Sequence, residues 1–91
     1  MKTKKFTQFA HVVKEARLRR GWSQESLDVL MGFKSNGQYI SQVERGLQAI
    51  PARRLRDLST HLETDIEAFI EALGDDYEAQ IREIAHDKSR T

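Results

Sequence analysis

The residues best suited to chemistry stand close together in the middle of the chain, on one side of a helix expected over residues 37–45. Ile40 and Val43 are spaced to face the interior, so small and polar residues take the outward positions. These outward residues are Gly37, Gln38, Ser41 and Gln42. A glutamine amide donates and accepts together, which matches N6 and N7 of adenine in the major groove of duplex DNA. Gln38 and Gln42 are thus able to bind base edges, but outward glutamines on a helix are by themselves more typical of ordinary solvated residues.

Catalytic chemistry has little support in this sequence. The three histidines, His11, His61 and His86, are far apart on different expected helices and have no metal-ligand spacing. The absence of cysteine excludes disulfides, thiolate metal sites and cysteine nucleophiles. No glycine elbow surrounds a serine, and no phosphate-binding loop is present. We therefore expect no catalytic residue, no metal and no tightly bound cofactor, and we do not expect an enzyme.

The elements that must position these glutamines are all helical. Apolar residues recur at steps of three and four throughout, and no stretch alternates as a strand does. Gly21, Gly32 and Gly46 end the first three helices. Pro51 begins the fourth helix, and Gly74 separates the last two. The expected helices span residues 7–20, 23–31, 37–45, 51–62, 64–73 and 75–87.

Side chains at three helix starts are suited to accept hydrogen bonds from the first backbone amides. Ser23 caps the second helix, and either Ser35 or Asn36 caps the third. Thr64 caps the fifth helix, with Glu67 as its capping-box partner. The apolar positions that face inward predict a single core: Phe6, Phe9, Val12, Val13, Ala16, Leu27, Leu30, Met31, Leu55, Leu58, Leu62, Ile66, Phe69, Ile70 and Leu73.

The formal net charge of +1 conceals an uneven distribution along the chain. Residues 1–56 hold 12 Lys/Arg and 4 Asp/Glu, a balance of +8, whereas residues 57–91 hold 3 and 10, a balance of −7. A basic half attracts a polyanion that an acidic half repels. One end of the molecule is therefore expected to face nucleic acid and the other to face something else. Duplex DNA is favoured over RNA, because most of the aromatic residues fit core positions.

Two stretches carry a more specific signal, RLRRGWSQE at residues 17–25 and ISQVERG at residues 40–46. With Leu27 and the Met31-Gly32 pair between them, they resemble the Cro and phage-repressor class of helix-turn-helix proteins, also called the xenobiotic-response-element family. The resemblance implies an all-α fold, a five-helix lambda-repressor-like DNA-binding domain with an additional C-terminal amphipathic helix. It also implies a sequence-specific regulator of transcription, in particular a repressor, that reads the major groove with the helix over residues 37–45.

The resemblance assigns roles to particular residues. Base contacts fall on Gly37, Gln38, Ser41 and Gln42. Gln24, at a helix start where free amides attract an anion, is expected to donate to a phosphate and to brace the recognition helix. Arg17 and Glu44 are expected to form a structural pair that sets the angle of this helix without touching a base. With the charged and turn residues nearby, the expected contacts to the DNA backbone are Gln24, Lys34, Ser35, Asn36, Tyr39, Arg45 and Arg20.

Two departures from the family pattern lie next to this helix. The turn between Gly32 and Ile40 is longer than usual by about two residues, and Asp28 stands where the family has a small apolar residue. A buried carboxylate without partners destabilises a protein by several kcal/mol. We expect the longer turn to supply the partners, with Asp28 accepting from amides at the start of the third helix. Tyr39 either contacts the DNA backbone or packs on this turn.

The chain is expected to comprise a basic flexible arm at residues 1–5, a helix-turn-helix domain at 6–73, and a C-terminal helix and tail at 74–91. The helix in the last part carries an apolar stripe that packs either on the core of its own subunit or on the same stripe of a second subunit. Modules of this class commonly bind as two-fold dimers, so we expect a homodimer on a pseudo-palindromic operator. The expected dimer interface consists of Phe69, Leu73, Tyr77, Ile81 and Ile84.

An interaction protein is the alternative. The chain is then an antitoxin that binds an operator and a toxin, or an adaptor that binds a protein partner through its acidic C-terminal half. No segment approaches membrane-spanning length, and the basic start lacks the apolar run and the cleavage site of a signal peptide. A cytoplasmic protein without a membrane partner is therefore expected.

Overall fold

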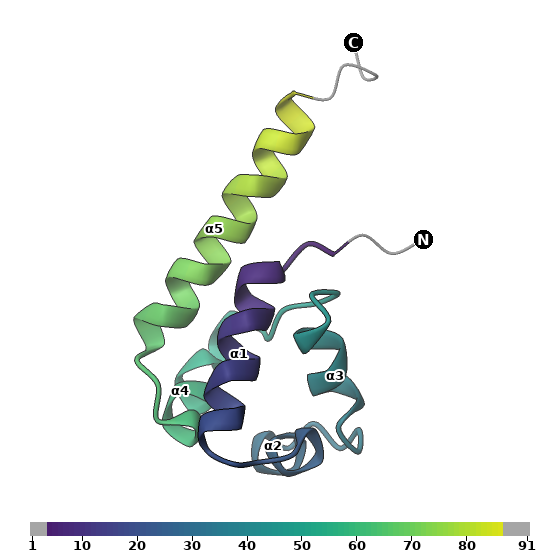
Figure 1. Ribbon diagram of the computed structural model, residues 1–91, viewed down its shortest axis with the longest axis vertical. Helices are drawn as coiled ribbons and strands as arrows, with labels where there is room; N and C mark the ends of the chain where they lie inside the picture. Colours follow the sequence, from purple (N-terminus) through teal and green to yellow (C-terminus); the bar gives the residue numbers. More distant parts are fainter. Residues whose placement is uncertain (1–3, 87–91) are drawn as a thin grey trace.

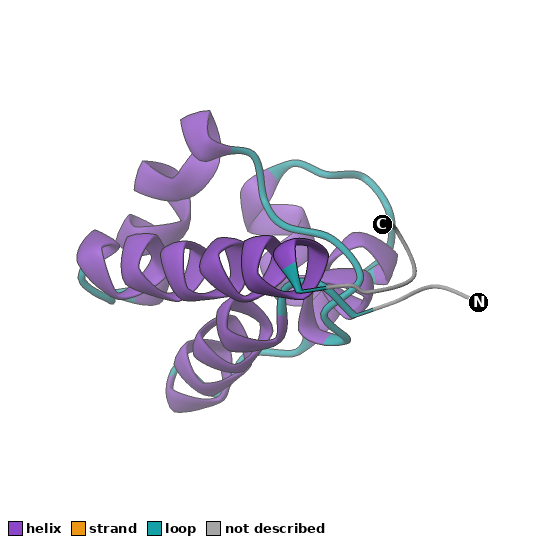
Figure 2. Ribbon diagram, turned by 90° about the horizontal axis from the view of Figure 1, so that it is seen from above, coloured by secondary structure: helices purple, strands orange, loops and turns teal. Residues whose placement is uncertain are grey.

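The computed structural model describes residues 4–86, and this part of the chain contains helices joined by loops and no strand (Figure 1 and Figure 2). Residues 1–3 of the expected arm and 87–91 of the expected tail lie outside the described residues. The predicted all-α class is confirmed. The elements are α1 Thr7–Arg19, α2 Gln24–Met31, α3 Gln38–Glu44, the short 3₁₀ helix η1 Ala52–Arg54, α4 Leu55–Leu62 and α5 Ile66–Ala85.

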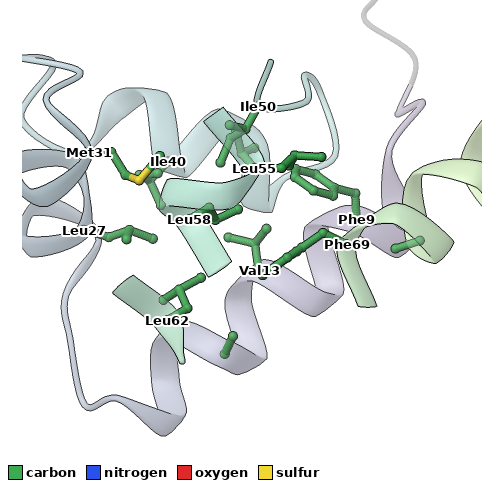
Figure 3. Close-up of a cluster of buried hydrophobic side chains, with 13 residues drawn as sticks. Phe9, Val13, Leu27, Met31, Ile40, Ile50, Leu55, Leu58, Leu62 and Phe69 are labelled. Carbon is green, nitrogen blue, oxygen red and sulfur yellow. The ribbon is translucent and has the colours of Figure 1, made fainter. Parts of the chain in front are cut away.

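One hydrophobic core joins the α-helices (Figure 3). The rings of Phe9 from α1 and Phe69 from α5 meet edge to face in this core, with centroids 6.0 Å apart. Ile40 and Val43 anchor α3 in the same core, as their spacing predicts. The other members are Val13, Ala16, Leu27, Met31, Ile50, Leu55, Leu58, Leu62 and Ala72. This packing fixes the orientation of α3 and leaves its opposite side toward solvent.

Two apolar residues expected in the core lie on the surface instead. Leu30 is 43% exposed and Ile70 is 45% exposed. α2 buries the side that carries Leu27 and Met31, and α5 buries the side that carries Phe69. Neighbouring residues on an α-helix point about 100° apart. Leu30 and Ile70 therefore fall beside the buried sides of their helices rather than on them.

The helix starts agree with the sequence pattern at α2 and differ at α5. Ser23 caps α2 as predicted, because its hydroxyl oxygen accepts from the amide of Ser26 at 3.0 Å. The capping box predicted for Thr64 and Glu67 is wrong, since Asp65 caps α5 and accepts from the amide of Glu67 at 2.9 Å. Both residue types make good caps. The path of the chain out of α4 decides which side-chain oxygen reaches the amides.

α5 continues through Gly74, so the predicted break between two helices at this residue is wrong. A glycine in a helix interior is less favourable than alanine by about 1 kcal/mol. Contacts on both sides outweigh that cost, because Phe69 before the glycine and Asp76 after it are buried against α1. No helix end marks the boundary expected between residues 73 and 74, and the additional C-terminal helix is the second half of α5.

Asp76 joins α5 to the start of α1. No side chain from its own segment caps α1. The two carboxylate oxygens of Asp76 instead accept from the backbone amides of Gln8 and Phe9, each at 2.9 Å. The carboxylate is only 3% exposed, and a negative charge is favourable at the positive end of a helix dipole. Asp76 thus fixes how α5 lies on α1. Local sequence patterns do not reveal this cap, because Asp76 is far along the sequence from the amides that it caps.

Beyond this anchor, the second half of α5 extends past the other helices (Figure 1). Between Tyr77 and Ala85, every residue except Gln80 is exposed. Short helical segments without packing partners are marginal in water. The projecting half of α5 therefore has an apolar side that the described part of its own domain leaves uncovered.

Candidate nucleic-acid interface

The solvent side of α3 carries the polar residues singled out by the sequence. Gln38 is exposed, and Ser41 and Gln42 are partly exposed. Gly37 is not available on this side. It is buried and has φ +88°, and a Cβ added to it would lie 3.1 Å from the amide nitrogen of Glu25 in α2. Because it packs against the start of α2, the expected base contact by Gly37 gives way to a structural role in bringing α2 and α3 together.

A buried ion pair holds α3 against α1 and α2. Arg17 Nε donates to Glu44 Oε2 at 2.6 Å and Arg17 Nη2 donates to Glu44 Oε1 at 2.9 Å, so the pair expected from the sequence is present. Arg17 Nη1 donates to the carbonyl of Trp22 at 2.7 Å. Gln24 Nε2 adds a hydrogen bond to Glu44 Oε1 at 3.1 Å. The hydrogen bonds that Arg17 donates to Glu44 raise the pKa of Arg17 above its ordinary value, although burial acts in the opposite direction. These contacts set the angle of α3.

The long turn before α3 closes around a buried carboxylate. Asp28 on α2 is 1% exposed, and its oxygens accept from the amide of Ser35 at 3.0 Å and from the Ser35 hydroxyl. The Ser35 hydroxyl oxygen also accepts from the amide of Tyr39 at 2.9 Å. Lys34 and Asn36 adopt positive φ angles of 57° and 54° to wrap the chain around this site. The longer turn therefore accommodates Asp28, as expected.

Hydrogen bonding decides the protonation state of Asp28. Burial acts to raise the pKa of its carboxyl, but hydrogen bonds from the Ser35 hydroxyl and from the amides of Ser35 and Gly37 outweigh burial and lower it below the ordinary value of 3.8. A carboxyl with a lowered pKa in the folded protein contributes stability above the pKa of the unfolded chain. That contribution disappears as the pH falls through the lower pKa of the folded state.

We expect Asp28→Asn to lower the free energy of unfolding by about 2 kcal/mol at pH 7, because charged hydrogen bonds to the turn are lost. The gap between the wild type and the variant will narrow as the pH falls below the ordinary pKa of 3.8, because the unfolded wild-type chain then binds a proton at Asp28 that the folded protein does not yet bind. Urea unfolding of both proteins between pH 7 and pH 3 measures the gap. A gap that stays constant over this range would contradict the assignment.

Two residues expected to contact the DNA backbone are engaged inside the protein. The hydroxyl of Ser35 is taken up by Asp28. The ring of Tyr39 stacks on Phe33 with centroids 4.3 Å apart, and its hydroxyl donates to the carbonyl of Ala49 at 3.2 Å. Of the two alternatives for Tyr39, packing on the turn is therefore the one observed. Lys34 and Asn36 on the same turn remain exposed.

Arg20 is also directed elsewhere. Its guanidinium pairs with Glu63 in the turn after α4 at 2.5 Å and lies over the ring of Trp22, 4.5 Å from the ring centroid. These contacts lead away from α3, so the structure does not support the expected backbone contact by Arg20. Arg45, which ends α3, is exposed beside the outward glutamines. The residues that lie together on and next to α3 are Gln24, Gln38, Ser41, Gln42 and Arg45.

The expected dimer interface on α5 is only partly accessible. Phe69 is fully buried in its own core, so its assignment to a dimer interface is wrong, and Leu73 packs partly against that core. Tyr77, Ile81 and Ile84 are 66%, 48% and 62% exposed. With the surface residues Ile70 and Gly74, they recur at alternating steps of four and three, the spacing of a coiled-coil seam. The sequence itself contains this spacing, but the residues form one seam only if a single helix continues through Gly74, where a break was expected.

We call Ile70, Gly74, Tyr77, Ile81 and Ile84 the α5 stripe.

In the described part of the chain, no group of histidine or acidic side chains is arranged to hold a metal ion. No helix of that part is both long enough and apolar enough to cross a lipid bilayer.

Comparison with known proteins agrees with this geometry. A family model described as helix-turn-helix matches residues 13–69, which is more than half of the chain and runs from the middle of α1 through the first turn of α5. No curated protein and no solved structure gives a significant match. The matched segment contains the Arg17–Glu44 ion pair, the long turn before α3 and the outward face of α3. The chain therefore belongs to the helix-turn-helix family of the Cro and phage-repressor type, whose members are DNA-binding regulators of transcription.

Proposed function

We propose that this protein is a repressor that binds a pseudo-palindromic operator as a homodimer and has no catalytic activity. The observation that carries the proposal is the polar outward face of α3, which Arg17, Glu44 and Gln24 hold at one angle. A short helix held in this way is suited to lie in the major groove with its first residues against base edges. Occupation of an operator that overlaps a promoter then blocks transcription.

In this proposal Gln38, Ser41 and Gln42 contact bases, and the surrounding groups bind phosphates. Gln24 is suited to a phosphate although its side chain already donates to Glu44, because an amide NH₂ carries two donors. The first backbone amides of α2 add positive partial charge at the same place. Lys34, Asn36 and Arg45 provide further contacts to the backbone, while Arg17 and Glu44 touch no base.

The α5 stripe is the proposed contact between the two subunits. It is largely apolar, and three of its residues, Tyr77, Ile81 and Ile84, lie on the half of the helix that projects in Figure 1. Its seam spacing suits packing against an identical helix. A two-fold dimer would present two copies of α3 to two half-sites. The same stripe also suits the alternative of a toxin or another protein partner, since such a partner would cover the same side chains. The oligomeric state of the isolated protein distinguishes the two.

The first experiment is the selection of bound duplexes from a random pool, followed by affinity measurements over a range of salt concentrations. We expect enrichment of a pseudo-palindrome and a linear fall of log affinity with log salt, because bound phosphates release counterions. Failure to enrich any duplex, or an affinity that does not respond to salt, would exclude the proposed DNA-binding role and favour an interaction protein.

On the selected duplex, we expect Gln38→Ala and Gln42→Ala each to weaken binding by about 5- to 150-fold, since a good pair of hydrogen bonds to a base is worth about 1–3 kcal/mol. Each variant should also lose the preference for one base in each half-site. Gln8→Ala is the matched control, because its exposed side chain lies on α1 at the end that meets α5. Glutamine variants that behave like this control would show that α3 does not read the bases.

A further inference from the structure

We propose that a concave basic site between the start of α1 and the end of α3 binds one phosphate of the DNA backbone in each half-site. The inference rests on the proposed function and extends the DNA contact surface beyond α2, α3 and the turn. The site has a volume of about 280 Å³, and its polar walls include Lys4, Thr7, His11, Lys14 and Arg45. We call it the α1–α3 pocket.

The charges around the α1–α3 pocket favour an anion. Within residues 4–86, no carboxylate pairs with Lys4, Lys14 or Arg45, so three cationic groups converge without a counter-ion. His11 meets its own neighbour on α1, Glu15, at 3.3 Å. Cationic groups brought together in one concavity repel one another and attract a phosphodiester, which carries one negative charge.

The acidic residue in the wall does not cancel this charge. Glu44 lines the pocket, but both of its oxygens accept hydrogen bonds from Arg17 at 2.6 and 2.9 Å, and one of them also accepts from Gln24. The carboxylate is therefore neutralised from its other side by a buried guanidinium. Lys4, Lys14 and Arg45 keep their charge available to a ligand.

The chain segment before α1 is held in place at this site. The amides of Lys5 and Phe6 both donate to the carbonyl of Gly46, at 2.9 and 3.1 Å, and Gln80 of α5 donates to the carbonyl of Lys5 at 3.0 Å. Gly46 has a φ of +79°, which other residues rarely adopt, so glycine favours the turn that presents its carbonyl to this segment. Backbone hydrogen bonds thus bring Lys4 to the wall of the pocket.

The α1–α3 pocket is continuous with the face that reads bases. Arg45 follows Ser41 by four residues and Gln42 by three, so it lies on the same side of α3 and one turn further along. A duplex whose major groove holds Gln38 and Gln42 would bring a strand of its backbone past Arg45. The Thr7 hydroxyl and the Lys14 ammonium are donors of the kind that bind phosphate oxygens.

The test compares Lys14→Gln with Arg19→Gln in the full-length protein on the selected duplex. Both cations are exposed on α1, but Arg19 faces the turn before α5, where it approaches Thr64. We expect Lys14→Gln to weaken binding about three- to tenfold and to reduce the slope of log affinity against log salt by about one, without changing base preference. Arg19→Gln should leave affinity and slope unchanged.

Neutral phosphates identify the contact directly. Uncharged methylphosphonates are placed one position at a time in the duplex, and one position in each half-site should weaken binding of the wild type but not of Lys14→Gln.

If wild-type protein binds the duplex while Lys14→Gln matches Arg19→Gln, the phosphate site is wrong and the proposed function stands. If inorganic phosphate shifts the amide signals of Lys14 and Arg45 and Lys14→Gln binds DNA normally, the pocket holds a free anion, which also overturns the inference. If the wild type binds no duplex, the proposed function itself fails.

Discussion

Replacement of Glu44 by alanine will lower the free energy of unfolding by about 3–5 kcal/mol, because it leaves a buried guanidinium without its counter-ion. The side chains of Arg17 and Glu44 are 9% and 4% exposed, and two hydrogen bonds join them. Small domains are stable by only about 5–15 kcal/mol in total. Thermal and urea unfolding followed by circular dichroism will measure the loss, and the melting temperature should fall by more than about 10 °C.

Two further variants test whether the stability lost in Glu44→Ala comes from the buried unpaired charge or simply from the loss of an ion pair. Glu78 and Arg82 form an exposed pair on α5, with side chains 60% and 71% exposed, and Glu78→Ala should change stability by less than about 0.5 kcal/mol. The double variant Arg17→Met with Glu44→Leu removes both charges and should recover much of the stability lost in Glu44→Ala. A loss in Glu44→Ala no larger than that in Glu78→Ala would refute the structural role of the pair.

Replacement of Ile81 by aspartate will convert the proposed dimer into a monomer and weaken binding to the full pseudo-palindrome by about 10²- to 10⁴-fold. Two joined modules bind a double site with an effective local concentration that separate modules lack. Ile81 lies in the middle of the exposed half of the α5 stripe, so a charge there would be buried in the subunit contact. Affinity for an isolated half-site should not change, since α3 is untouched.

The control for this experiment is Ala79→Asp, which introduces the same charge on the same exposed part of α5 but outside the α5 stripe. Sedimentation velocity will report the oligomeric state, and fluorescence anisotropy will report affinity for the full site and the half-site. A wild-type protein that stays monomeric at tens of micromolar, with Ile81→Asp binding the full site normally, would rule out the dimer. It would leave a different protein partner as the occupant of the α5 stripe.

Local patterns in the sequence are sufficient to predict much of this structure. The steps of three and four between apolar residues place the helices, and Ile40 with Val43 correctly orients α3, because helical periodicity is a property of a short segment. Ser23 is recognised as a cap for the same reason, since the amide it meets is three residues away. The motifs around residues 17–25 and 40–46 indicate the family, which the match over residues 13–69 confirms.

Contacts between distant segments are beyond the reach of such patterns. Gly74 reads locally as a helix end, yet α5 continues because Asp76 binds the amides of Gln8 and Phe9 at the start of α1. Arg20 reads as a free cation until the fold brings Glu63 next to it. In each case the energy that decides the outcome comes from a partner more than forty residues away along the chain. Periodicity and propensity describe what a segment favours alone, whereas the choice of partner depends on how the helices pack.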